Sequence, residues 1–434
     1  MQKFILITLL CAFSIPGMAQ QQLTLQQCID IALENNRNIK QQELNRQSRE
    51  IAFNQARADL LPNFNANAGH SFNFGRSIGL DNVYQNVNSQ QTRFGIGSDI
   101  TIFDGMRLRR NIDARRADIY ASDADLQRIQ EDIILSVSSA FLQVLLSKEL
   151  LQIAENQLEM TDRRIAQQTE MVESGRLAQG ELIELEAQRA REEMNRVQAA
   201  NNVKLALLDL AQIMGLDNFD NFSIVAPATE TLINDVLLLP TAAIYESALI
   251  NRPEVRGAQF RLETREHELQ MARALHTPTL SLGVNSGTGY FNMSGRDNQS
   301  FGHQFRNNMS HSIGFNLRIP IFNRFQVRNN VSNAMLAVEN QRIEIDRTKI
   351  ELHRRIEQAH LSAIGAQARW AAAQKSEAAS REAFRFVEQR FESGRANAFE
   401  LFLAQNNLAQ VLAEQVQAKY EFAFRIKILE LLKN

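Results

Sequence analysis

A short motif with acidic and basic side chains occurs twice in the chain. Glu173-Ser-Gly-Arg176 is repeated in the second half of the chain as Glu392-Ser-Gly-Arg395. In each copy a glutamate, Glu181 or Glu400, follows six residues after the glycine. Both glutamates fall in the first turn of a predicted helix, where the helix dipole alone would favour an acid. Their matching positions in both copies favour a functional role over a purely structural one.

The other residues that could do chemistry lack the partners that chemistry requires. His353 and His360 are seven residues apart on a predicted helix, a spacing that alone is no metal signature. Arg265-Glu-His-Glu lacks the second histidine of a zinc protease motif. The sequence contains no G-x-S-x-G motif and no Walker loop. We therefore predict no enzyme, no catalytic residue, no cofactor and no metal site, and any energy for transport must come from a partner.

The composition and the N-terminus indicate an exported protein. The 434 residues carry a formal net charge of −2, which gives no reason to expect a nucleic-acid partner. Residues 1–19 combine one lysine, an apolar run and the small residues Gly17 and Ala19, as in a secretory signal peptide. Cys28 is then the only cysteine left, so no internal disulfide can form, and it is expected in the core. No later stretch approaches the roughly 18 consecutive apolar residues of a membrane-spanning helix, which predicts no transmembrane helix.

The chain is predicted to be a tandem duplication. Gln55-Ala-Arg-Ala-Asp-Leu-Leu-Pro62 corresponds to Met271-Ala-Arg-Ala-Leu-His-Thr-Pro278. Ile102-Phe-Asp-Gly corresponds to Ile321-Phe-Asn-Arg, at the same offset that relates the two Glu-Ser-Gly-Arg motifs. Blocks in one order at nearly one offset indicate repeats. The predicted boundaries are 20–215 for the first repeat, 216–240 for a connector, and 241–434 for the second repeat.

Each repeat should contain one very long helix followed by a second helix that runs back along it. Residues 106–174 contain neither proline nor glycine, and a helix over this range would be about 105 Å long. A second helical stretch follows in each repeat, over 177–214 and 395–434. The sequence therefore predicts two antiparallel hairpins, with tips near Gly175 and Gly394, where glycine permits the reversal of the chain.

The long helix of the second repeat has two rows of apolar residues at seven-residue spacing. The first row is Val331, Val338, Ile345, Leu352 and Ala359. The second row is Leu336, Ile343, Ile350 and Ile364, and it is broken at Glu357. Seven-residue rows are typical of coiled coils. Two adjacent rows predict neighbours on both sides of the helix, as in a cylinder of helices.

Four segments alternate between apolar and polar residues and are predicted strands. They lie at about 62–76, 91–103, 278–291 and 310–322. Each has one apolar face and one face rich in Asn, Gly, Ser, Asp or Arg, and the segments of each pair are separated by polar loops. In an exported chain this pattern is typical of an outer-membrane barrel. Four strands cannot close a barrel, and open edges are not tolerated in lipid, so several copies must combine in a ring.

Four segments of the mature chain match those of a known family. They are Leu23-Thr-Leu-Gln-Gln-Cys-Ile-Asp-Ile-Ala-Leu-Glu-Asn-Asn36, Ala248-Leu-Ile-Asn-Arg-Pro-Glu254, Ile319-Pro-Ile-Phe-Asn323, and Phe391-Glu-Ser-Gly-Arg395 followed by Glu400-Leu-Phe-Leu-Ala-Gln405. The chain resembles the outer-membrane efflux proteins, the TolC-like channels. The resemblance implies a mainly α fold with a small β part, in which hairpins form a trimeric α-barrel and strands form a 12-stranded transmembrane β-barrel. It further implies a homotrimer in the outer membrane that extends into the periplasm and works with a periplasmic adaptor and an inner-membrane pump.

The resemblance also implies where the functional residues lie. Adaptor docking is expected at the hairpin tips, at Ser174, Gly175, Ser393 and Gly394. A gate at the periplasmic end is expected from Glu181, Glu184, Glu400, Arg176 and Arg395. The sequence departs from some members at Leu403, where a second acid is replaced by apolar leucine, and at Ala396, where a gating base is absent.

Three functions are compatible with these features. The first is a passive duct of a tripartite efflux or type I export system, opened by its partners. The second is a free-standing diffusion porin, which would have no use for long periplasmic helices. The third is a structural coiled-coil protein of the envelope whose strands form a soluble sheet.

Overall fold

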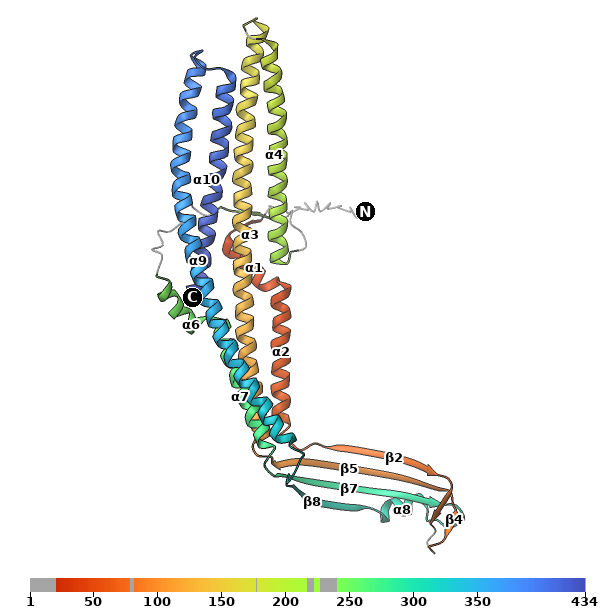
Figure 1. Ribbon diagram of the computed structural model, residues 1–434. Helices are drawn as coiled ribbons and strands as arrows, with labels where there is room; N and C mark the ends of the chain where they lie inside the picture. The colour runs from red at the N-terminus through yellow and green to blue at the C-terminus, as the bar shows by residue number, and fades with distance from the viewer. Residues whose placement is uncertain (1–20, 79–81, 177, 217–221, 227–239, 434) are drawn as a thin grey trace, which may run out of the picture. The chain divides into compact units, whose positions relative to one another are not determined.

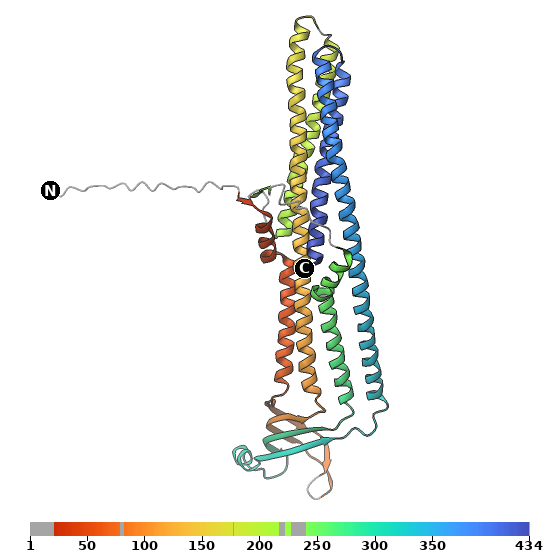
Figure 2. The ribbon, with the colours of Figure 1, turned by 90° about the vertical axis from the view of Figure 1, so that its left-hand side faces the viewer.

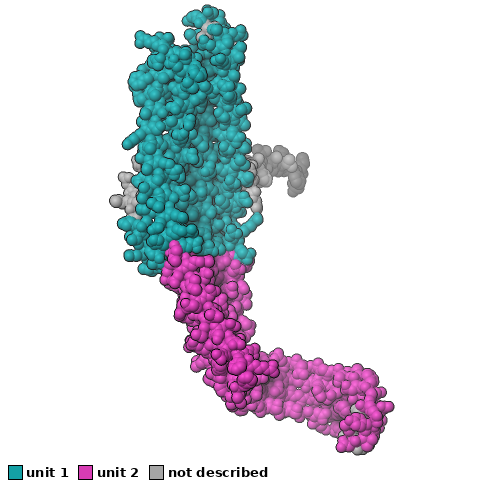
Figure 3. Space-filling model, viewed as in Figure 1, with its two compact units in different colours: residues 1–41, 127–252, 351–434 teal, residues 42–126, 253–350 magenta. Residues whose placement is uncertain are grey.

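The computed structural model describes residues 21–78, 82–176, 178–216, 222–226 and 240–433. The predicted signal peptide, 1–19, and most of the predicted connector, 216–240, lie outside the described residues. The chain divides into two compact units (Figure 3). Unit 1 consists of Met1–Gln41, Gln127–Arg252 and Glu351–Asn434, and unit 2 consists of Gln42–Leu126 and Pro253–Ile350.

The helices repeat in length and in order. In the first half they are α1 (Leu25–Asn35), α2 (Arg37–Ala58), α3 (Arg107–Glu173) and α4 (Gln179–Met214), with 11, 22, 67 and 36 residues. In the second half they are α6 (Thr241–Asn251), α7 (Pro253–Ala274), α9 (Gln326–Glu392) and α10 (Ala398–Lys433), with the same four lengths. The fold is therefore a tandem duplication, as predicted.

The ends of these helices follow from the residues at their boundaries. Thr24 and Gln27 form a capping box at the start of α1. Pro253 is the first residue of α7, where its missing N–H is not needed. α3 lies between Gly105 and Gly175, which both have a positive φ of 70°. Breaker residues thus limit the helices, and the long interval between breakers permits 67 uninterrupted residues in α3.

Two antiparallel hairpins make up most of unit 1. α3 runs against α4, and α9 runs against α10, with the hairpins side by side (Figures 1 and 2). The unit also contains α1, α6 and two short strands: β1 (Gln21–Leu23) pairs in parallel with β6 (Phe222–Ile224). Cys28 in α1 is fully buried, as expected.

The two rows of apolar residues on α9 differ in burial. Four members of the first row are buried in the single chain: Val338, Ile345, Leu352 and Ala359. The second row is exposed: Leu336, Ile343, Ile350 and Ile364 are 69%, 59%, 70% and 43% exposed. The first row therefore packs within the chain, and the second row is an apolar seam without a partner in a single copy.

One stretch of α3 is an exception to the prediction of no membrane-spanning helix. Among the described residues, α3 alone contains an 18-residue window that is apolar enough, by composition, to cross a membrane. The helix has no continuous apolar run of that length, and 44% of the window is buried inside the chain. Buried side chains of α3 include Val137, Phe141 and Val144, which have no exposed surface. The apolar character of α3 is that of a helix packed in a coiled coil.

A four-stranded antiparallel sheet forms part of unit 2. Its strands, in spatial order, are β2 (Asn65–Asn73), β5 (Ser89–Phe103), β7 (Thr279–Met293) and β8 (Ser310–Arg318). The register places Ile100, Leu282 and Phe315 in one row, and Asp99, Gly283 and Gly314 in the next. The sheet thus has an apolar face and a polar face, and β2 and β8 are its two edges (Figure 1).

The two polar segments between the strands contain more structure than the predicted loops. β3 (Arg76–Ile78) pairs with β4 (Tyr84–Asn86) in a short hairpin. The helix α8 (Phe301–Asn307) lies before β8. Short ordered elements are possible here because each segment contributes aromatic side chains, such as Tyr84 and Phe301, that pack locally.

Candidate functional site: the hairpin tips

The first hairpin turns through a left-handed glycine. Gly175 has a φ of +70°, and its N–H donates to Val172 O at 2.9 Å. The N–H of Arg176 donates to Met171 O at 2.8 Å. These two bonds are those of a Schellman motif, which satisfies the last carbonyl groups of α3. The side chains of Ser174 and Arg176 complete the turn, since Arg176 Nε donates to Ser174 Oγ at 2.9 Å.

The second hairpin repeats this turn. Gly394 has a φ of +72°, its N–H donates to Phe391 O at 2.9 Å, and the N–H of Arg395 donates to Arg390 O at 2.7 Å. A Cβ atom added at Gly175 or Gly394 would meet no atom within 4 Å. The glycines are therefore required by backbone conformation alone, and the space around both turns is open to a partner.

The predicted gate residues are only partly brought together within one chain. Glu400 lies in the first turn of α10 and forms an ion pair of 3.2 Å with Arg390 on α9. Asn397 caps this helix, because its Oδ1 accepts from the N–H of Glu400 at 2.8 Å. The tip of the second hairpin therefore holds a partly exposed acid beside a base that the sequence analysis did not select.

The other predicted gate residues point into solvent. Glu181 lies in the first turn of α4, and Glu184 follows one turn later, both exposed. Among the described residues, neither glutamate has an ion pair, and Arg176 and Arg395 are exposed as well. Nothing in the described part of a single chain joins these charges to Glu400, so any common ring must form between copies.

Polar contacts behind the tips join the first hairpin to the second. Arg164 on α3 donates from Nη1 to Gln405 Oε1 on α10. Gln157 on α3 donates from Nε2 to Asn406 Oδ1 on α10 at 2.9 Å. Burial lowers the pKa of the Arg164 guanidinium, while the nearby Glu388 and Glu192 carboxylates act in the opposite direction. These contacts fix α10 against α3 a few turns behind each tip.

A buried carboxylate lies in the same layer. Glu192 on α4 is 3% exposed, and its Oε1 accepts from Gln188 Nε2 at 2.8 Å and from Gln157 Nε2 at 3.3 Å. Its second oxygen, Oε2, has no hydrogen-bond donor among the described residues. A buried carboxylate is costly unless it is paired, so the position of Arg164 nearby matters for the stability of this layer.

A second link between the hairpins lies farther from the tips. Glu149 on α3 accepts from Lys419 Nζ at 3.0 Å and from the Tyr420 hydroxyl, both on α10. Burial raises the pKa of Tyr420, and the hydrogen bond to Glu149 and the charge of Glu149 add to this effect. The phenol is therefore neutral and remains a donor at every physiological pH.

Sequence reasoning missed the residues that hold the long helices of unit 1 against one another. Arg164, Glu192, Arg390 and Gln405 resemble any polar residue of a long helix when read in isolation. A usable signal was the spacing of Gln188 and Glu192, four residues apart in line with the buried face of α4. Their partners come from other helices, whose relative register cannot be read from one sequence.

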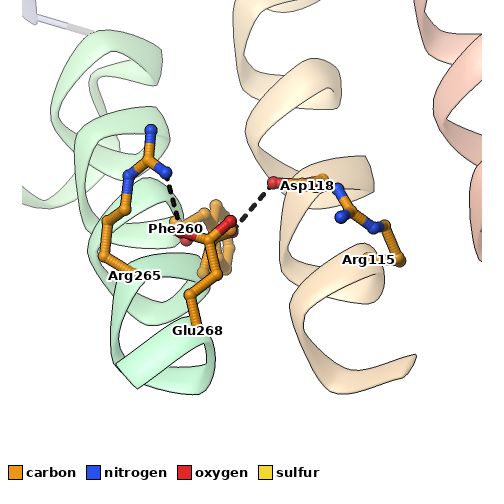
Figure 4. Close-up of polar contacts among 6 residues, drawn as sticks. Arg115, Asp118, Phe260, Arg265 and Glu268 are labelled. Carbon is orange, nitrogen blue, oxygen red and sulfur yellow. Dashed lines mark hydrogen bonds and ion pairs between the residues drawn. The ribbon is translucent and has the colours of Figure 1, made fainter. Parts of the chain in front are cut away.

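A polar pocket lies in unit 2 and carries no chemistry of its own. It has a volume of about 670 Å³ and is lined by side chains of α2, α3, α7 and α9. Four charged side chains in its lining are paired: Arg115 with Asp118 at 2.9 Å, and Arg265 with Glu268 at 2.7 Å (Figure 4). Among the described residues there is also no cluster of three or more His, Cys, Asp or Glu that could hold a metal ion.

The pattern that defines outer membrane efflux proteins matches residues 28–216 and 244–425. The two matched segments coincide with the two repeats and cover most of the chain. The chain belongs to the outer membrane efflux protein family. This is a family of channels rather than enzymes, and the recognition made from the sequence is confirmed.

Three curated relatives match most of this chain, and the names of two of them refer to secretion or to the outer membrane. Protein CyaE of Bordetella pertussis is 24% identical over 96% of this chain and 85% of its own length. The proteases secretion protein PrtF of Dickeya chrysanthemi is 22% identical over 97% of this chain and 90% of its own. Outer membrane protein TolC of Escherichia coli is 24% identical over 76% of this chain and 66% of its own.

Solved structures have the same fold at low identity. The outer membrane channel CmeC of Campylobacter jejuni matches with a TM-score of 0.79 and 19% identity, over 94% of this chain and 85% of its own. The open state of the MtrE channel of Neisseria gonorrhoeae matches with a TM-score of 0.76 and 21% identity, over 94% and 89%. The outer-membrane efflux protein is thus a channel that extends from the outer membrane into the periplasm, and the structural coiled-coil alternative is set aside.

Proposed function

We propose that three copies of this outer-membrane efflux protein form a closed duct that is shut at the hairpin tips until a periplasmic adaptor and an inner-membrane pump open it. The observation that carries the closed ring is the pair of free edges: β2 and β8 each have one unpaired side in the described sheet. Unpaired backbone groups are very unfavourable in lipid, so β8 of one copy must pair with β2 of the next. Three copies would give the 12 strands that the family resemblance implies.

The helices support the same assembly. The exposed row of α9 includes Ile343, and α2 exposes Leu44 and Ile51, again seven residues apart, at 59% and 69%. Rows of this length on an isolated chain would be unfavourable in water. Packing of α9 from one copy against α2 of another would cover both rows and continue the cylinder of helices.

The tips would provide both the docking surface and the gate. Ser174, Gly175, Ser393 and Gly394 lie on the outermost turns, where an adaptor can contact the backbone. The gate is assigned to Glu181, Glu184, Glu400, Arg176 and Arg395, with Arg390 added as the partner of Glu400. Three copies of Glu400 around one axis would form a negative ring that binds cations and repels anions. Opening would separate the two hairpins of each chain and break the contacts of Arg164 and Glu149.

Replacement of Glu400 by alanine tests the gate. In planar lipid bilayers the wild-type channel should conduct little, and Glu400→Ala should raise its basal conductance or weaken block by divalent cations. Glu382→Ala is the matched control, because Glu382 also forms an exposed ion pair on α9 but lies in the body of that helix, well before the turn at Gly394.

A second variant distinguishes the effect of the ring of Glu400 carboxylates from the effect of the ion pair between Glu400 and Arg390. Arg390→Met removes the partner of Glu400 but leaves the carboxylate, so it should strengthen divalent block rather than weaken it. Unchanged conductance and unchanged block in Glu400→Ala would refute the gate. A wild-type channel that is fully open from the start would indicate a diffusion porin instead.

A further inference from the structure

The helix α8 replaces a missing part of β8 along the edge of β7. β7 has 15 residues and β8 has nine, and their pairing ends at Gly287 and Ser310. Beyond this point Gln304 of α8 donates from Nε2 to Phe291 O and accepts at Oε1 from Phe291 N, each at 2.9 Å. A side-chain amide thus satisfies backbone groups that a strand would otherwise satisfy, and α8 is fixed at the far end of β7 (Figure 1).

The aromatic side chains of α8 turn onto the apolar face of the sheet. The ring of Phe305 lies 5.7 Å from that of Phe94, and the ring of Phe301 lies 5.3 Å from that of Tyr290, between centroids. Thr288 Oγ1 donates to Phe305 O at 2.6 Å. Phe94 and Thr288 are opposite each other in the register and lie on the face that carries the apolar residues. α8 therefore lies on the lipid-facing side of the barrel, not in its lumen.

A groove separates α8 from the small residues of the sheet. It has a volume of about 420 Å³, within the roughly 300–1,000 Å³ typical of ligand sites. Small side chains form its floor and larger ones its sides: Ala66, Ala68, Ser286, Phe94, Phe305 and Met309. Met309, one of these lining residues, is 51% exposed. The groove is open and mostly apolar, as an acyl chain requires.

The groove lies at the outer boundary of the membrane. Thr288 is nine residues beyond Thr279, the end of β7 that follows α7. At about 3.4 Å per residue and a tilt of about 40°, this distance is about 23 Å along the membrane normal. The apolar band of such barrels is about 25 Å tall. α8 is therefore at the level where acyl chains meet lipid headgroups.

Basic side chains occur on the two elements that flank the groove, α8 and β8. Arg306 of α8 is exposed, and among the described residues it has no ion pair. His303 on α8 and His311 on β8 are exposed as well, and His311 is paired with Ser286 on the apolar face. An apolar groove beside an arginine without a counter-ion is complementary to a lipid that bears a phosphate.

We propose that this groove binds one acyl chain of an anionic, phosphate-bearing lipid of the outer leaflet, with Arg306 at the phosphate. The proposal goes beyond channel function: it rests on the insertion of the strands in the membrane, not on the gate. Each copy would then hold one slowly exchanging lipid at the extracellular rim of the barrel. The floor must remain small for this purpose, and Ser286 is one of its small residues.

Electron spin resonance of spin-labelled lipids tests the site in bilayer nanodiscs of phosphatidylcholine. Labelled phosphatidylglycerol should show one immobilised lipid per chain, with about fivefold preference over labelled phosphatidylcholine at low salt. Arg306→Gln should remove the preference for phosphatidylglycerol. Ser286→Leu should fill the groove and reduce the immobilised lipid by one per chain.

Two control variants accompany the measurement. Arg296→Gln removes an exposed arginine from the turn after β7, outside α8, and Ser98→Leu enlarges a residue on the apolar face outside the groove. Both should behave as wild type. The proposal is overturned if phosphatidylglycerol shows no preference, or if Arg296→Gln or Ser98→Leu has the same effect as its counterpart. A gate that fails its own test would leave this result unchanged.

Discussion

Replacement of Arg164 by methionine should loosen the contact between the two hairpins of each chain. Methionine retains an apolar stem of similar length but cannot donate to Gln405 Oε1. It also leaves the buried carboxylate of Glu192 without the positive charge nearby. Hydrogen bonds to charged groups contribute about 1.5–3 kcal/mol. We therefore expect the equilibrium between docked and separated hairpins to shift by about 12- to 160-fold in each chain.

Single-channel recording measures this shift as open probability. Arg164→Met should open the channel without adaptor or pump, and the effect should be larger than that of any exposed ion pair. Arg163→Met is the matched control, because Arg163 is the adjacent residue and its pair with Glu159 is 74% and 61% exposed. Such a pair contributes about 0.3–0.5 kcal/mol, so Arg163→Met should change open probability by no more than about twofold.

A second substitution identifies the source of the effect. If the buried carboxylate drives the hairpins apart, Glu192→Gln in the Arg164→Met background should recover part of the closed state. The reasoning is refuted if Arg164→Met leaves open probability at the wild-type value. It is equally refuted if Arg163→Met opens the channel to the same extent.

Three further outcomes are expected. Gly394→Ala should destabilise the second tip by roughly 1–2 kcal/mol, because alanine at a φ of +72° is strained, and hydrogen exchange at the tip should become faster. Gly180→Ala, inside α4 with open space around it, should leave the rate of hydrogen exchange unchanged. Burial raises the pKa of the Cys28 thiol from its ordinary 9.0 to about 11. Alkylation of this thiol at pH 8 should therefore be about a hundredfold slower than in the unfolded chain. The contribution of the neutral thiol to the free energy of unfolding should be complete below pH 9 and should be lost as the pH rises toward 11. Ile343→Glu should place a carboxylate in the apolar seam and prevent assembly, which native mass spectrometry of the detergent-solubilised protein would detect, whereas exposed Arg347→Glu should assemble normally.

The long elements could be predicted because few residues decide them. A stretch without proline or glycine between Gly105 and Gly175 leaves the helix no place to end, and the structure has α3 over Arg107–Glu173. The seven-residue spacing predicted the two apolar rows of α9, but it did not predict which row packs within the chain, where Leu352 is buried and Ile350 is 70% exposed. Periodicity is a local property of the sequence, so it can be recognised without knowing which helix packs against it.

The short elements could not be predicted in the same way. Residues 292–309 were expected to be a polar loop, but α8 occupies part of this segment. Phe301 and Phe305, four residues apart, were the available signal. Seven residues are too few to form a helix by propensity, so α8 depends on Gln304 and on the free edge of β7, which are tertiary features.

The predicted gate residues show that equivalent positions in the two repeats can have different contacts. The repeat makes Glu181 and Glu400 equivalent, but the structure does not: Glu400 has Arg390 at 3.2 Å, and the residue that corresponds to Arg390 in the first repeat is Met171. In the described part of the chain the first tip therefore has an acid without a base, held only by the helix dipole. The second tip can exchange the Arg390 partner for a cation or for the acid of another copy. If one hairpin moves during opening, we expect it to be the second hairpin, because its Glu400 can change partners. The first hairpin offers an adaptor only its backbone turn and its exposed charged side chains.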